Sequence, residues 1–225
     1  MGFNLLARPY HFLEKVVFAN RLQRARCAHM EIFLEAEQIL LLGEGDGRFL
    51  EALLKQGCRA EIICYDLSTA MLDIARKRVA GKADKVHFLN GDIHQLSLPL
   101  EFQPDVIGAH FFLDCFRENE LVDISRRIQG VSRPGCKMVV TDFQLPSGSW
   151  FVRSGGRVLI CLMLLFFRIF AGITARKLTD WHGLLTDQGW QCRKKSMSDQ
   201  GLIGSWVMER PVTKGLDRCH PVATI

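Results

Sequence analysis

The sequence predicts an α/β protein in which helices cover both faces of a doubly wound, mainly parallel sheet. The stretch ILLLGEGDGRFL, at Ile39–Leu50, gives a buried apolar strand, a glycine turn and the start of a helix. Apolar strand-like runs then alternate with helical runs, and acidic or polar residues stand where the strands end. The last two strand-like runs are joined by Ser198–Gly201, which predicts a closing hairpin.

The glycine turn indicates a ligand site. Gly43, Gly45 and Gly47 let the backbone turn sharply and approach a ligand closely. The helix that follows begins with free N–H groups and a positive dipole end. A dinucleotide turn has the spacing G-x-G-x-x-G, whereas the third glycine here comes one residue early. Glu44 and Asp46 stand between the glycines, so the turn suits a ligand with a cationic end better than a pyrophosphate.

Two more acids stand at predicted strand ends. The second strand, 60–65, leads into Asp66, which is placed to accept hydrogen bonds from both hydroxyls of a ribose. The third strand, 86–89, is followed by Asp92 and Ile93. Because ligands of such sheets bind at the carboxyl ends of the strands, these residues and the glycine turn are expected to form one site.

These motifs resemble those of class I S-adenosylmethionine (SAM) methyltransferases over roughly 39–210. The glycine turn is similar to their motif I, and Asp66 with the following LSTAML resembles their D-x-S-x-x-M-L run. The resemblance implies a Rossmann-like, seven-stranded sheet with an antiparallel last strand. It also implies that SAM is bound with Asp66 on the ribose, Asp92 on the adenine amino group and Ile93 against the adenine ring. The implied SAM contacts are Tyr10, Gly43, Glu44, Gly45, Asp66, Leu67, Met71, Asp92, Ile93 and His110.

One position departs from the family pattern. The family has an acid two residues before the first glycine, where this chain has Leu41. Binding of the SAM ammonium group would therefore fall to Glu44 or to backbone carbonyls.

The N-terminal segment, 1–36, predicts a helical cap in two pieces, with a break at Pro9. It resembles the cap of ubiquinone/menaquinone-type methyltransferases, the UbiE-like group, where an Ala-x-x-Tyr element closes over SAM. Tyr10 would then contact SAM, the alternative being a packing role. The SAM-binding domain is expected over 37–210, and 211–225 as a flexible tail.

An apolar run at 158–167 lies in a predicted insertion, 146–178, after the fifth strand. It is too short for a bilayer span, which takes about 20 residues, and being apolar all round it has to be buried. Three fates stay open: a core helix, a dimer or membrane-surface contact through 158–170, or a lid over an apolar acceptor. In related enzymes this insertion carries substrate-binding residues. The candidate acceptor contacts are Phe111, Met163, Phe166 and Phe167.

His110 and Asp114 are the candidate catalytic residues. His110 stands at the end of the fourth strand, where a neutral imidazole with an ordinary pKa of about 6.5 suits removal of a proton from a phenol or enol. Asp114, four residues on, would orient the ring if the segment turns helical. The alternative is that both residues only position SAM. No His, Cys or Asp residues have metal-ligand spacing.

Composition bounds the partners and the compartment. Net charge is +5, and the basic residues are scattered, so no nucleic-acid groove is expected. Eight cysteines without a C-x-x-C pair predict reduced, mostly buried thiols. The short apolar stretch 2–7, broken by Asn4, does not resemble a signal peptide. A cytoplasmic protein is expected.

The leading hypothesis is SAM-dependent methyl transfer to a small apolar acceptor, such as a quinol, a phenol or a polyketide-like acid. A short-chain dehydrogenase is rejected, because it needs Tyr-x-x-x-Lys and neither Tyr10 nor Tyr65 has Lys four residues on. A non-catalytic SAM-fold binding or assembly protein stays open, because such enzymes rely on positioning rather than on an obligatory base.

Overall fold

The computed structural model describes residues 21–81, 84–144, 179–198 and 201–211. Within these ranges a seven-stranded sheet has the order β3-β2-β1-β4-β5-β7-β6. Strands β1 to β5 run parallel, and β7 is antiparallel to both of its neighbours. The predicted doubly wound sheet with an antiparallel last strand is confirmed. The strands are β1 (Gln38–Leu42), β2 (Glu61–Asp66), β3 (Val86–Asn90), β4 (Val106–His110), β5 (Lys137–Phe143), β6 (Gln191–Ser198) and β7 (Ile203–Glu209).

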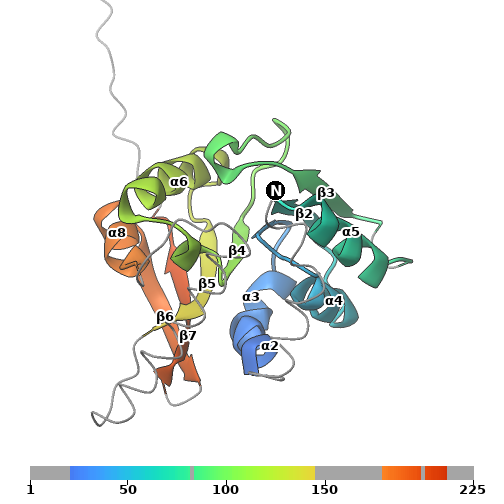
Figure 1. Cartoon of the computed structure of the whole chain (residues 1–225), viewed down its shortest axis with the longest axis horizontal. Coiled ribbons are helices and arrows are strands. Elements are labelled where there is room, and N and C mark those ends of the chain that lie inside the picture. Colours follow the sequence, from blue (N-terminus) through green and yellow to red (C-terminus); the bar gives the residue numbers. More distant parts are fainter. Residues whose placement is uncertain (1–20, 82–83, 145–178, 199–200, 212–225) are drawn as a thin grey trace, which may run out of the picture.

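Helices cover both faces of this sheet (Figure 1). Helices α3, α4 and α5 pack on one face, with α2 beside α3, and α6 and α8 cover the other face. The helices are α2 (Arg21–Arg26), α3 (Met30–Leu34), α4 (Arg48–Lys55), α5 (Thr69–Arg78), α6 (Glu118–Val131) and α8 (Trp181–Asp187), with short 3-10 turns η2 (Cys27–His29), η3 (Ile93–Gln95) and η4 (Leu113–Cys115).

Alternate residues of the strands fill two cores. In β1, Ile39 and Leu41 pack with α3 and α4, whereas Leu40 and Leu42 pack toward α6 and α8. All four are almost completely buried, as expected for a parallel strand with helices on both sides. Each such side chain stabilises the fold by about 1.5–3 kcal/mol relative to an exposed one.

Local chemistry explains several element ends. Gly57, with φ +84°, follows α4 and stops it, as the sequence predicts. The Ser68 hydroxyl accepts a hydrogen bond from the Met71 N–H at 3.3 Å and caps α5. Helix α8 has no counterpart among the sequence predictions, because seven residues are too few for a helical period to be read reliably.

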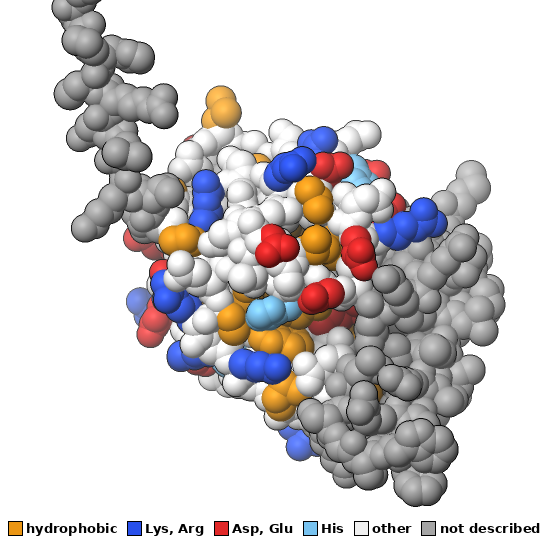
Figure 2. Space-filling view, turned by 90° about the vertical axis from the view of Figure 1, so that its left-hand side faces the viewer, with side chains coloured by type: hydrophobic (Ala, Val, Ile, Leu, Met, Phe, Trp, Pro, Cys, Tyr) orange, Lys and Arg blue, Asp and Glu red, His pale blue; other side chains and the backbone are white. Residues whose placement is uncertain are grey.

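Charged side chains of both signs are interspersed with apolar ones on the face that carries α6 and α8 (Figure 2). None of the helices within the described ranges is long and apolar enough to cross a membrane. Tyr10, Met163, Phe166 and Phe167 lie outside the described residues, as do the insertion and almost all of the expected tail.

Candidate functional site

The carboxyl ends of the parallel strands meet at one edge of the sheet, and the glycine turn after β1 lies there. Gly43, Gly45 and Gly47 all have left-handed φ angles, from +60° to +80°. A Cβ on Gly43 would lie 2.5 Å from the Phe112 ring, and one on Gly47 would lie 2.8 Å from the Ala75 backbone. A Cβ on Gly45 would meet nothing within 4 Å. Two glycines are thus needed for packing, and the middle one borders open space.

Asp66, the last residue of β2, fastens the end of this strand to the turn. Its Oδ2 accepts a hydrogen bond from the Gly45 N–H at 3.2 Å, and its Oδ1 accepts one from the Ser68 N–H at 2.8 Å. Burial raises the pKa of the carboxyl, while the two amides act in the opposite direction. A carboxylate has about four acceptor positions, so both oxygens keep capacity for ribose hydroxyls.

Asp92 follows β3 at the same edge. Its Oδ1 accepts a hydrogen bond from the His94 N–H at 2.9 Å and caps η3, and the residue is exposed. The Tyr65 hydroxyl donates to the Asp92 carbonyl at 3.1 Å. It lies 2.1 Å from where a Cβ of Gly91 would be, so only glycine fits beside this hydrogen bond.

The apolar candidates divide between surface and core. Leu67 is 55% exposed between Asp66 and the helix cap, whereas Ile93 and Met71 are buried. The exposed Leu67 next to Asp66, with Asp92 after the neighbouring strand, offers an apolar face and hydrogen-bond acceptors, both of which an adenosine requires. With the open space at Gly45, these residues fit the adenosine part of SAM.

Glu44 has a structural task in this fold. Its Oε1 accepts a hydrogen bond from the Leu50 N–H at 2.9 Å, at the start of α4, and the side chain is buried. Burial raises the pKa of Glu44 to about 7, although the Leu50 amide and the charge of Arg26 act in the opposite direction. Asp46 is paired with Arg48 at 3.1 Å and with Arg78 at 3.0 Å. This arrangement leaves backbone carbonyls as the better candidates for the SAM ammonium group.

Glu44→Gln is expected to stabilise the protein at pH 8 and to leave its stability unchanged near pH 4. Because the pKa of Glu44 is raised in the folded state, folding is favoured most below the ordinary pKa of a glutamate, where the carboxyl is protonated. The folded protein loses this stability as the pH rises through about 7. The amide still accepts from Leu50 but cannot ionise. Urea unfolding should show a gain of up to roughly 3 kcal/mol at pH 8, at about 1.4 kcal/mol per pKa unit. The exposed Glu35→Gln is the control, and a gain that does not vary with pH would contradict the assignment.

His110 is the last residue of β4, and its ring lies inside the core. Its ring contacts Phe49 edge to face, at 4.5 Å between centroids, and lies 5.9 Å from Phe33. Its Nδ1 lies 3.0 Å from Thr141 Oγ1, and its Nε2 has no hydrogen-bond partner among the described residues. Burial, and to a smaller extent the charge of Arg26, lowers the pKa of His110 to about 3. A buried ring with so low a pKa is a weak base, which favours positioning over a general base.

Asp114 pairs with β5 rather than with His110, which corrects the expected His110–Asp114 contact. The Asp114 N–H donates to Asp142 Oδ2 at 3.1 Å, and the Phe143 N–H donates to Asp142 Oδ1 at 3.0 Å. Burial raises the pKa of both carboxyls, and Asp114 raises that of Asp142 further. Two neighbouring carboxyls in a dry site share a proton more readily than they both ionise.

Phe111 and Phe112 shape the backbone after β4. Phe111 has a φ of +54°, which is strained for a bulky residue, and its ring packs on Phe143 at 4.9 Å. Phe112 packs against Gly43 and against Phe116, at 5.1 Å between ring centroids. Phe112 therefore contacts the glycine turn, whereas the Phe111 ring packs on β5.

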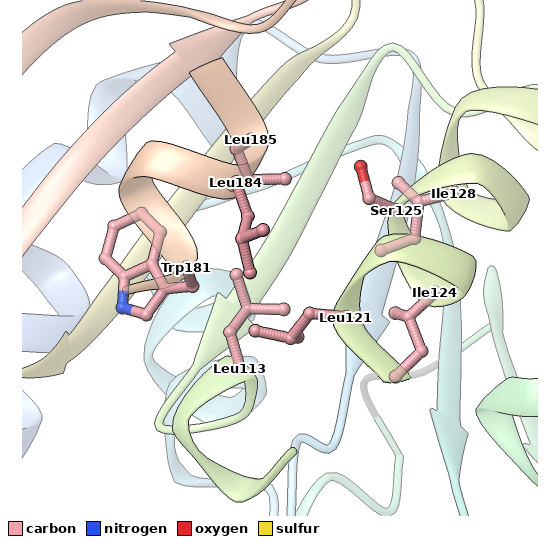
Figure 3. Close-up of a pocket in the computed structure, with 8 residues that line it drawn as sticks. All are labelled: Leu113, Leu121, Ile124, Ser125, Ile128, Trp181, Leu184 and Leu185. Carbon is pink, nitrogen blue, oxygen red and sulfur yellow. The ribbon is translucent and has the colours of Figure 1, made fainter. Parts of the chain in front are cut away.

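A small cavity lies between α6 and α8 (Figure 3). Its volume of about 10 Å³ is room for roughly one water molecule, so it cannot hold the acceptor. Ser125 Oγ has no hydrogen-bond partner among the described residues. The lining residues are Leu113, Leu121, Ile124, Ser125, Ile128, Trp181, Leu184 and Leu185.

Sequence reasoning assigned no role to Arg26, Thr141 or Asp142. The strand pattern places an acid, Asp142, at the end of the fifth strand, but it does not show that Asp114 is the partner of this acid. Arg26 is one of 29 Lys and Arg residues, and nothing in its local sequence separates it from the others. No group of three or more potential ligand side chains suited to a metal occurs in the part of the chain that the structure describes.

Comparison with known proteins agrees with this geometry. Residues 39–135, less than half of the chain, match a family model described as a methyltransferase domain. Malonyl-[acyl-carrier protein] O-methyltransferase of Priestia megaterium is 29% identical over 109 residues, 48% of this chain and 39% of that protein. The chain spans about two fifths of this curated relative.

Solved structures share the fold. Mitomycin 7-O-methyltransferase MmcR superposes with a TM-score of 0.69 at 19% identity, over 93% of this chain and 61% of that one. An O-methyltransferase family 2 protein from Planctomyces limnophilus, solved with apigenin, superposes with a TM-score of 0.69 at 15% identity. This match covers 93% of this chain and 62% of that one. At these identities the likeness shows the fold alone. The comparisons therefore show that residues 39–135 match a methyltransferase domain and that the seven-stranded sheet with its antiparallel β7 has the fold of these methyltransferases.

Proposed function

We propose that this protein transfers a methyl group from SAM to a small apolar acceptor. The observation that carries the proposal is the Asp66 carboxylate, held against the Gly45 N–H at 3.2 Å, beside exposed Leu67 and Asp92. SAM supplies an electrophilic methyl group when bound. The acceptor's oxygen, nitrogen or carbon forms a bond to that methyl carbon as the S–CH₃ bond breaks, and S-adenosylhomocysteine (SAH) and a proton are the other products.

The residues at this edge have distinct proposed roles. Asp66 accepts from the ribose, Asp92 accepts from the adenine amino group, and Leu67 and Ile93 flank the ring. Gly45 leaves space for the ligand. Methyl transfer then depends on holding the SAM methyl group and the acceptor atom in line, in a site that excludes water. Such a mechanism needs no general base, which agrees with the buried, weakly basic ring of His110.

The finer assignment concerns the acceptor. We infer a quinol-, phenol- or polyketide-like molecule and a relation to the UbiE-like group. Relatives named for O-methylation, one of them solved with the phenolic apigenin, support this choice. The apolar insertion 146–178 with Met163, Phe166 and Phe167 would cover the acceptor, and Tyr10 of the 1–36 cap would close over SAM. Contact with a membrane surface through 158–170, a homodimer and a cytoplasmic location remain part of this proposal.

Methyl transfer from labelled SAM to a panel of quinols, phenols and polyketide-like acids tests the proposal. Turnover of at least one class is expected, with equimolar SAH. Calorimetry with SAH on the same protein separates two failures: binding without transfer would favour a non-catalytic binding or assembly protein, and no binding would overturn the proposal altogether.

His110→Gln should lower turnover far less than the roughly 10²–10⁴-fold loss typical of a removed general base. Glutamine keeps a polar partner for Thr141, and the acidic limb of the pH–rate profile should persist. His87→Gln, at an exposed position, is the matched control. Loss of that limb together with a large loss of turnover would restore His110 as the base.

A further inference from the structure

We propose that Asn90 and Tyr65 are positioning residues that hold the ribose-binding and adenine-binding residues of the SAM site in place. Each side chain belongs to one strand and binds the backbone at the end of the neighbouring strand or in the loop after it. The inference rests on the proposed function, since it takes Asp66 as the ribose acceptor and Asp92 as the adenine acceptor. It gives a task to two residues that the sequence motifs leave without one.

Asn90 is the last residue of β3 and lies opposite Asp66, the last residue of β2. Its side-chain amide nitrogen donates to the Asp66 carbonyl at 3.0 Å and to the Leu67 carbonyl at 2.9 Å. Because both partners are carbonyl oxygens, only the NH₂ end of the amide can face them. One side chain from β3, the edge strand of the sheet (Figure 1), thus holds two successive peptide groups after β2.

These contacts fix the residue that carries the ribose acceptor. The Asp66 carbonyl also accepts from the Gly91 N–H at 3.1 Å, so both of its lone pairs are used. With its backbone held in this way, Asp66 keeps the orientation in which its carboxylate accepts from the Gly45 N–H at 3.2 Å. The Leu67 carbonyl is held as well, and Leu67 is the exposed residue proposed to flank the adenine.

Tyr65 makes the reciprocal contact, from β2 to the loop after β3. Its hydroxyl donates to the Asp92 carbonyl at 3.1 Å, and the residue is buried. Gly91 leaves room for this hydroxyl, because a Cβ there would lie 2.1 Å from it. The Asp92 carboxylate accepts from the His94 N–H at 2.9 Å. The contacts of Asn90 and Tyr65 therefore cross between β2 and β3 and hold the backbone of both acids.

Holding both acids in advance has a consequence for binding. A site that is ordered before the ligand arrives does not have to be ordered at the cost of affinity. An acceptor also discriminates between ligands best when it is held where the donor of the ligand will be. We therefore expect Asn90 to control the preference for the ribose hydroxyls and Tyr65 to control the preference for the adenine amino group.

Calorimetry with three ligands tests this division. SAH carries both groups, its 2′-deoxy analogue lacks one ribose hydroxyl, and S-inosylhomocysteine has an oxygen in place of the adenine amino group. Asn90→Ala is expected to weaken SAH binding by about ten-fold and to reduce the preference for SAH over the 2′-deoxy analogue by about three- to ten-fold. The preference over the inosine analogue should stay within about two-fold.

Tyr65→Phe removes only the hydroxyl, and the opposite pattern is expected. The preference for SAH over S-inosylhomocysteine should fall by about three- to ten-fold, and the preference over the 2′-deoxy analogue should stay within about two-fold. Asn119→Ala, at an exposed position of α6, is the control and should change neither preference.

The outcomes separate two kinds of failure. Equal weakening of all three ligands by Asn90→Ala would overturn the proposal, because Asn90 would then only support the fold. Asn90→Asp keeps the size of the side chain but replaces both donors by acceptors, so unchanged SAH affinity in this variant would overturn it as well. If neither variant folds, NMR of the wild-type protein decides: the side-chain amide protons of Asn90 should exchange slowly with solvent, and rapid exchange would contradict the contacts. A wild-type protein that binds none of the ligands would refute the proposed function instead.

Discussion

Asp66→Ala is expected to weaken SAH binding by about ten-fold or more, because buried donors of the ligand lose a partner at a cost of roughly 1–3 kcal/mol. The same change removes the acceptor of the Gly45 N–H and of the Ser68 N–H. The glycine turn is then no longer fastened to β2, so affinity falls both through a lost contact and through a less ordered site. Calorimetry with SAH at constant pH measures the loss.

Asp73→Asn is the control for this experiment, because Asp73 lies on the same helix–strand unit but is 62% exposed. Asp66→Asn adds a finer comparison. It keeps one acceptor oxygen, so a loss smaller than that of Asp66→Ala is expected. Unchanged SAH affinity in Asp66→Ala would remove Asp66 from the binding site.

Phe49→Ala is expected to lower the free energy of unfolding by about 3–5 kcal/mol, a large part of the total for a domain of this kind. Phe49 is completely buried and packs edge to face on Phe33, at 4.9 Å between centroids, and on His110 at 4.5 Å. Truncation leaves a cavity beside a buried imidazole. Water entering it would let the pKa of His110 rise from about 3 toward the ordinary value.

Urea unfolding measures the stability change, and NMR titration of the histidine ring measures the pKa. Phe49→Leu should cost less than Phe49→Ala, since most of the volume is kept. Leu100→Ala, at a 95% exposed position, is the control and should change stability by less than about 0.5 kcal/mol. A loss below about 1 kcal/mol in Phe49→Ala would contradict the packing of α4 on β4.

Much of the fold could be predicted because its determinants are local in the chain. Apolar runs such as 39–42 mark strands buried on both faces, Gly57 marks the end of α4, and Ser68 marks the start of α5. The acids at the ends of β2 and β3 could likewise be placed at the carboxyl edge of the sheet. Both follow the carboxyl ends of parallel strands, and Asp66 accepts a hydrogen bond from Gly45 of the glycine turn.

The pairing of polar groups between strands could not be predicted. Glu44 stands in a turn that suits a ligand, yet its side chain turns inward to cap α4, because six residues on, the Leu50 N–H needs an acceptor. His110 and Asp114 are four residues apart, but a strand end and a strained turn at Phe111 separate their side chains. The spacing of residues in the sequence predicts neither the inward turn of Glu44 nor the separation of His110 from Asp114.

The sequence by itself determined the strand–turn–helix motif, the strand and helix alternation and the acids at the carboxyl edge of the sheet, because each depends on residues close in the chain. Only the tertiary structure decided that His110 faces Thr141 and that Asp114 faces Asp142, pairs separated by 31 and 28 residues. It also decided that Arg26 reaches the end of β4. These contacts follow from the register of β4 on β5 and from the docking of α2, and burial then sets the charge states of the side chains that they bring together.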